Sequence, residues 1–83
     1  MSGYHKKNIK KGELGQASKI REEFEEFEDA LAQNNQLMAL MELSDLIGAI
    51  ELYALRFNLE MTDLLIMKDA TKGAFISGRR KND

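Results

Sequence analysis

The chain has 83 residues, enough for one small domain, which we expect to span residues 1–83 without an internal linker. Apolar residues make up 43% and charged residues 31%, a balance that is typical of a folded protein and excludes a disordered acidic tail. Because cysteine is absent, disulfides, zinc–thiolate sites and thiol nucleophiles are excluded, and a reducing cytoplasmic location is expected. The longest apolar runs, residues 37–41 and 46–50, are far shorter than the ~20 residues of a membrane helix, so no membrane partner is expected.

Charge is distributed unevenly along the chain, although the formal net charge is only −2. Six acids occupy eight consecutive positions in residues 22–29, whereas basic residues are concentrated in residues 1–11 and 79–83. We expect these two basic segments to be mobile tails. An acidic centre with basic ends suits a site for a cation and a polyphosphate, although solvated surface charge is the commoner explanation of such runs.

The pattern of apolar residues predicts an all-α fold, because the chain has no proline and few β-branched residues. The first predicted helix covers residues 13–33. Its apolar positions recur at three- and four-residue steps and form one stripe that needs a partner helix: Ala17, Ile20, Phe24, Phe27 and Leu31. Asn34 and Asn35 mark the turn of a helical hairpin, since asparagine tolerates left-handed conformations.

The second predicted helix, residues 36–57, is apolar nearly all round and is therefore expected to be central. Asn58 ends it, and Thr62 is expected to cap a third helix that continues to about residue 75, with Asp63 at its positive end. A single third helix leaves the second one incompletely covered. We therefore predict a homodimer whose hairpins form a four-helix bundle, with a homotetramer as the alternative.

Two carboxylates, Glu42 and Asp45, interrupt the most apolar helix, and their three-residue spacing places them on one helical face. Buried carboxylates are costly unless they are neutralised, paired or bound to a metal. The simpler alternative is that both lie on the surface or pair with lysines from elsewhere.

The hairpin places a second pair of carboxylates opposite the first. Glu26 and Glu42 lie about eight residues to either side of the turn, and Glu23 and Asp45 lie about eleven, so the two pairs form two rungs. With helix axes ~8–10 Å apart, four carboxylates can converge on hard cations. We therefore predict that Glu23, Glu26, Glu42 and Asp45 bind Mg²⁺, for which Mn²⁺ is a possible substitute.

Helical periodicity makes Glu26 the least secure of these four ligands, because it points about 130° away from the centre of the apolar stripe, which Glu23 borders. The competing pair, Glu22 and Glu25, points further from the stripe and is expected to face solvent. Glu28 flanks the stripe on its other side and remains an alternative.

These residues resemble a known signature. The segment Lys-Ile-Arg-Glu-Glu-Phe-Glu-Glu at residues 19–26, followed after fifteen residues by Glu-Leu-Ser-Asp-Leu at 42–46, resembles the E-x-x-E and E-x-x-D motifs of MazG-like all-α nucleoside triphosphate pyrophosphatases. The similarity covers residues 17–80. Residues 71–79 also look like the basic segment of small, phage-type members.

The resemblance implies hydrolysis of a nucleoside triphosphate between its α- and β-phosphates, which gives the monophosphate and pyrophosphate. It implies that the carboxylates hold Mg²⁺, that Glu23 or Glu26 orients or deprotonates the attacking water, and that the protein is a dimer or tetramer. The expected location is the cytoplasm, or the host cytoplasm if the protein is viral. The candidates for binding phosphate oxygens are Lys68, Lys72, Arg79, Arg80 and Lys19.

Two hypotheses from other classes compete with the enzyme. Residues 54–65 have the helix, turn and second-helix onset of a DNA-binding helix-turn-helix. On the third predicted helix, the positive charges of Lys68 and Lys72 are balanced by Asp63 and Asp69. This weakly charged surface argues against a nucleic-acid partner. A non-catalytic acidic helical adaptor would explain the charge run but not Glu42 and Asp45. The single histidine, His5, lies in the expected N-terminal tail, so neither a ferritin-like di-iron site nor a Ser-His-Asp triad is predicted.

Overall fold

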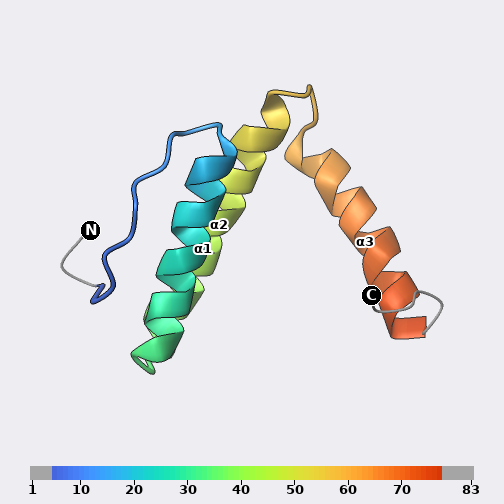
Figure 1. The fold of residues 1–83 in the computed structure, drawn as a ribbon. Coiled ribbons are helices and arrows are strands. Elements are labelled where there is room, and N and C mark those ends of the chain that lie inside the picture. The colour runs from blue at the N-terminus through green and yellow to red at the C-terminus, as the bar shows by residue number, and fades with distance from the viewer. Residues whose placement is uncertain (1–4, 78–83) are drawn as a thin grey trace.

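The computed structural model describes residues 5–77, with the backbone alone for Phe75 and Ser77. This part of the chain contains three helices and no strand: α1 (Ala17–Ala32), α2 (Gln36–Leu55) and α3 (Met61–Ser77). The prediction of an all-α fold is therefore confirmed. Figure 1 shows α1 and α2 side by side as a hairpin and α3 leading away from it. Arg79 and Arg80 lie outside the described residues.

The turn between α1 and α2 is made by the two asparagines that the sequence marks. Asn34 takes a left-handed conformation with φ 56°. Asn35 caps α2, because its side-chain oxygen accepts the backbone N–H of Met38 at 3.0 Å. The other end of α1 begins later than predicted, at Ala17 and not at residue 13. The reason is Gly15, whose φ of 81° belongs to a turn that a non-glycine residue adopts only with strain.

Asparagine also ends α2. Asn58 has φ 61°, and the following N–H of Leu59 bonds back to the carbonyl of Ala54 at 3.2 Å, as in a Schellman motif. The prediction that Thr62 caps the third helix is wrong, because α3 already begins at Met61. Instead, the Asp63 carboxylate accepts the backbone N–H of Glu60 at 2.8 Å, which is half of a capping box.

The seam between α1 and α2 is built from small apolar residues and carboxylates. The buried apolar side chains among the described residues are Ala30, Met38, Ala39, Ala49 and Ala54. The predicted stripe of α1 faces α2 only in part: Phe27 packs against the buried cluster of Ala30, Met38 and Ala39, whereas Phe24 is 46% exposed and Leu31 52%. Alanines on both helices allow a close approach of the two backbones, so that larger side chains lie outside the seam.

The third helix leaves much apolar surface uncovered. It makes little contact with α1 or α2, as Figure 1 shows. Three consecutive apolar side chains of α3 are exposed: Leu65 by 46%, Ile66 by 70% and Met67 by 57%. None of the described helices combines the length and hydrophobicity that crossing a bilayer requires.

The N-terminal segment, residues 5–12, which the sequence predicts as a mobile tail, lies along α1 in the structure. At one end the backbone N–H groups of Lys6 and Lys7 each donate to the Asp29 carboxylate at 3.2 Å. At the other end the N–H of Gly12 donates to Glu22 Oε1 at 2.9 Å. The segment therefore runs antiparallel to α1 and covers carboxylates of that helix.

Candidate metal centre

The structure brings the four predicted carboxylates together on the seam between α1 and α2. Glu23 of α1 lies beside Glu42 and Asp45 of α2, with one oxygen of each within 4.8 Å of the others. Glu26 satisfies the same criterion with Glu22 and Glu23, and also with Glu42 and His5. Glu42 thus links two neighbouring groups of potential ligands.

Two of these carboxylates are buried and incompletely satisfied. Glu23 and Glu42 are each 5% exposed, and the Oε1 atom of each has no hydrogen-bond partner. A buried polar atom without a partner is destabilising, typically by ~1–3 kcal/mol and by more if it is charged. Asp45, in contrast, is exposed at the edge of the group. A cation among these side chains would satisfy the two free oxygens.

Glu26 lies in the seam, although helical periodicity made it the least secure of the four predicted ligands. Its side chain is only 15% exposed, because α1 turns Glu23 and Glu26 toward α2 and leaves Phe24 partly in solvent. Burial raises the pKa of Glu26, and the neighbouring carboxylate of Glu42 raises it further. Burial also raises the pKa of Glu23, with the charge of Glu26 adding to the effect against the opposing Lys19.

Glu22 is buried, although the sequence predicts that it faces solvent. Its side chain is covered by the N-terminal segment and accepts hydrogen bonds from the Gly12 N–H and from Lys19 Nζ at 3.0 Å. Although desolvation opposes it, these two bonds and the charge of Lys19 lower the pKa of Glu22. Glu25 is half-buried and Glu28 is exposed.

The predicted phosphate-binding residues are scattered. Lys19 is at the site, but its ammonium pairs with Glu22 Oε1 and with Glu23 Oε2, both at 3.0 Å. Lys68 and Lys72 lie on α3, away from the seam. Lys68 pairs instead with its neighbour Asp69 at 2.8 Å. Within one chain, the carboxylates are therefore not joined by the lysines of α3.

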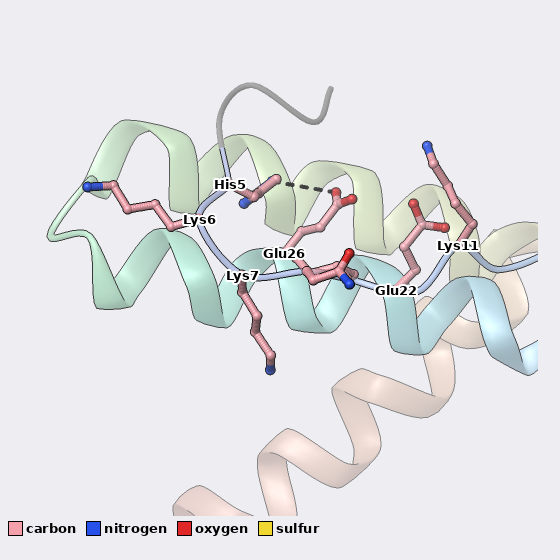
Figure 2. A pocket seen from close by; sticks show the side chains of 8 residues that line it. His5, Lys6, Lys7, Lys11, Glu22 and Glu26 are labelled. Atoms are coloured by element: carbon pink, nitrogen blue, oxygen red, sulfur yellow. Dashed lines mark ion pairs between the residues drawn. The ribbon is translucent and has the colours of Figure 1, made fainter.

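Two residues at the site were missed by sequence reasoning, namely His5 and Asp29. The His5 side chain is 5% exposed, and its Nδ1 lies 2.8 Å from Asp29 Oδ2. Its Nε2 lies 3.2 Å from Glu42 Oε2 and 3.9 Å from Glu26 Oε1. Figure 2 shows the ring between the N-terminal segment and the two helices, next to Glu26.

Asp29 anchors this arrangement from the last turn of α1. Besides the imidazole and the two backbone N–H groups, it accepts a hydrogen bond from Gln33 Nε2 at 2.8 Å. Against the cost of desolvation, these donors hold the pKa of Asp29 below its ordinary value. Only the spacing Glu22–Glu26–Asp29, which follows one helix face, marked Asp29 in the sequence. No local signal marked His5, which lies 24 positions before Asp29.

A cavity of about 300 Å³ opens between the N-terminal segment and α1. Its wall combines basic and acidic groups, and the residues that line it include Lys6, Lys7, Lys11, Glu22 and Glu26. In Figure 2 the lysine side chains point outward and away from one another, whereas Glu22 and Glu26 come from the same face of α1. The cavity therefore presents carboxylates on the side of α1 and lysine side chains at its rim.

The arrangement can hold hard divalent cations, because its donors are carboxylate oxygens concentrated in a partly buried seam. Comparisons of the chain with protein-family models, with curated proteins and with solved structures gave no match. The functional argument consequently rests on the residues of this chain and on their geometry.

Proposed function

We propose that the protein is a Mg²⁺-dependent nucleoside triphosphate pyrophosphohydrolase of the MazG-like kind, which cleaves between the α- and β-phosphates to give a nucleoside monophosphate and pyrophosphate. One observation carries the proposal. Glu23 and Glu42 are buried with a free oxygen each, beside Glu26 and Asp45, on the two helices that carry the E-x-x-E and E-x-x-D motifs.

The donor set fits Mg²⁺, which prefers carboxylate oxygens and commonly completes its coordination with water and substrate phosphates. Glu23, Glu42 and Asp45 would hold the ion. Because the Asp45 side chain is exposed, a phosphate can approach the ion from that side. When bound, Mg²⁺ neutralises phosphate charge and acidifies a water.

Glu26 is the group that we assign to orient the attacking water and accept its proton. It lies beside Glu23 and Glu42 and is half-buried. Burial and the neighbouring Glu42 carboxylate raise the pKa of Glu26. A carboxylate with a raised pKa is a better proton acceptor near neutral pH. Glu23 remains the alternative for this role.

The working form is proposed to be a homodimer built as a four-helix bundle, or a homotetramer formed from two dimers. Large apolar side chains are exposed along α2 and α3, which a second copy would cover: Leu37, Leu40, Met41, Ile47, Leu52, Leu65, Ile66 and Met67. In such an assembly α3 of one copy can bring Lys68 and Lys72 to the carboxylates of the other. A cytoplasmic location remains a prediction.

The test is the release of pyrophosphate and orthophosphate from a panel of ribo- and deoxyribonucleoside triphosphates, with Mg²⁺ and with chelator. We expect metal-dependent pyrophosphate without orthophosphate, and its loss in Glu42→Gln. The matched control is Glu51→Gln, the same substitution at an exposed position of the same helix. Full activity of Glu42→Gln, or no turnover of any nucleotide by the unmodified protein, would overturn the proposal.

Neither alternative function gains support from a specific observation. A helix-turn-helix over residues 54–65 needs its two helices packed together, whereas α3 makes little contact with α2. Lys68, the first basic residue of α3, is paired with Asp69. A non-catalytic adaptor would not explain why Glu23 and Glu42 each have a buried oxygen without a hydrogen-bond partner.

A further inference from the structure

His5, the only histidine in the sequence, contacts carboxylates through both ring nitrogens: Nδ1 faces Asp29, and Nε2 faces Glu26 and Glu42. Nδ1 of His5 lies 2.8 Å from Asp29 Oδ2, so the carboxylate accepts a hydrogen bond from Nδ1–H. A histidine that binds a metal through one nitrogen usually donates its other N–H to a carboxylate or carbonyl, which sets the tautomer and the ring orientation. Asp29 occupies that second position here, and it is itself fixed by Gln33.

The other nitrogen, Nε2, points between two helices. It lies 3.2 Å from Glu42 Oε2 on α2 and 3.9 Å from Glu26 Oε1 on α1, and the ligand atoms of the three residues all lie within 4.8 Å of one another. Metal–nitrogen and metal–oxygen bonds are ~2.0–2.2 Å long, so two ligands of one ion are separated by about 3–4 Å. The two separations from Nε2, 3.2 and 3.9 Å, are therefore those of ligands of a single ion.

A second observation points to a ligand at this place. Glu42 is 5% exposed, and its Oε1 has no partner although its Oε2 faces His5. A protonated His5 would donate to Asp29 and Glu42 but would leave that oxygen unsatisfied. A divalent ion would satisfy Glu42 and Glu26 together and would use the Nε2 lone pair.

We infer that His5, Glu26 and Glu42 form a second metal position, selective for divalent ions that accept imidazole, such as Co²⁺ or Zn²⁺, and that Asp29 is the residue that positions the ring. Imidazole suits these ions, whereas an all-oxygen set such as Glu23, Glu42 and Asp45 suits Mg²⁺. The inference rests on the proposed function for its carboxylates and adds a ligand from the N-terminal segment. Glu42 would be shared by the two positions. When the second position is occupied, Glu26 is a ligand and Glu23, the alternative named above, orients the attacking water.

The experiment is a titration of the untagged full-length protein with Co²⁺, followed by NMR of the His5 ring. Because the chain has one histidine, its two carbon-bound ring protons are assigned without ambiguity. We expect large paramagnetic shifts of both signals at one equivalent of Co²⁺, and the same shifts when excess Mg²⁺ is present to occupy the all-oxygen position. This readout needs no substitution, so it does not depend on how a variant folds.

Substitutions then separate a ligand from a structural residue. His5→Gln should lower Co²⁺ affinity more than tenfold and leave Mg²⁺ affinity unchanged, and Asp29→Asn should lower Co²⁺ affinity about 10–100-fold. The matched control is Asp45→Asn, which should weaken Mg²⁺ binding and leave the Co²⁺-induced ring shifts in place.

Ring signals that do not respond while Co²⁺ saturates the protein, or equal Co²⁺ affinity in His5→Gln, would overturn the inference. The outcome is separable from that of the proposed function. Mg²⁺-dependent pyrophosphate release without ring shifts would keep the enzyme and remove the second metal position. Ring shifts without turnover of any nucleotide would do the reverse.

Discussion

Glu26 of α1 and Glu42 of α2 face each other across the hairpin seam, with His5 Nε2 3.9 Å from one and 3.2 Å from the other. The pKa of Glu26 is raised by burial and by the charge of Glu42. Two carboxylates in one seam repel each other unless a proton or a cation lies between them. The metal-free protein therefore stores an electrostatic cost at this contact, and cation binding relieves it.

Glu26→Gln should stabilise the metal-free protein and keep its response to Mg²⁺, because Glu23, Glu42 and Asp45 are retained. The amide carries no charge, so the repulsion with Glu42 disappears, and we expect the free energy of unfolding to rise by about 1 kcal/mol at neutral pH. Urea unfolding with chelator and with excess Mg²⁺ measures both effects. For the unmodified protein, Mg²⁺ at 100 times its Kd should add about 2.7 kcal/mol. The control is Glu28→Gln on the exposed side of α1, and an unchanged free energy of unfolding in Glu26→Gln would contradict the repulsion between Glu26 and Glu42.

The stability of the metal-free protein should vary with pH through the pair formed by His5 and Asp29. The other side of the His5 ring faces Glu26 and Glu42. Desolvation lowers the pKa of His5, but the bonds to Asp29 and Glu42 outweigh it, so the folded pKa lies above the ordinary 6.5. Its stabilisation is therefore fully present below pH 6.5 and is lost as pH rises through the raised value. Asp29, whose pKa is lowered from 3.8, stabilises above that pH and loses its contribution as pH falls through the lowered value.

The pair thus contributes fully between about pH 3.8 and pH 6.5. Unfolding in urea, measured with chelator across a pH series, should show stability falling on the alkaline side. Because the pKa values of Glu23 and Glu26 are also raised, these residues also make the free energy of unfolding fall with rising pH, but at lower pH than His5 does. The informative quantity is therefore the difference in free energy of unfolding between the unmodified protein and His5→Gln. That difference should shrink as pH rises above 6.5, and a constant difference would be evidence against the His5 contacts.

Gly12→Ala should displace the N-terminal segment. A Cβ at this position would clash with the backbone oxygen of Ser18, so no side chain can be accommodated without movement. We expect a loss of about 1–3 kcal/mol in stability and faster tryptic cleavage after Lys6 and Lys7. The control is Gly73→Ala on α3, where nothing lies within 4 Å of the new Cβ and helix propensity should improve. Equal cleavage rates in all three proteins would show that the segment does not depend on this contact.

Self-association should depend on the exposed apolar face of α3. Ile66 is 70% exposed in a single chain, which favours burial against a second copy. Light scattering at micromolar concentration should give a dimer or tetramer mass for the unmodified protein and a shift toward monomer for Ile66→Glu. Asp69→Glu, a charge-conserving change at an exposed position of the same helix, should leave the mass unchanged. A monomeric unmodified protein at high concentration would refute the assembly.

The local features of the fold could be predicted from the sequence because short-range chemistry decides them. Asn34 and Asn58 end the first two helices since asparagine tolerates the left-handed conformation that both adopt. The count of residues on either side of the turn then placed Glu23 and Glu26 opposite Glu42 and Asp45, because helical rise is constant.

Only the tertiary structure decided which face of α1 meets α2. Periodicity favoured the stripe containing Phe24 and Leu31, but close packing of alanines such as Ala30 and Ala39 turned the carboxylates into the seam. His5 entered the site through hydrogen bonds to a residue 24 positions away, and no local pattern encodes a contact of that range. The sequence by itself determined where the helices begin and end to within a few residues and which carboxylates lie level with one another. Long-range packing and backbone hydrogen bonding decided which of them are buried and that a histidine joins them.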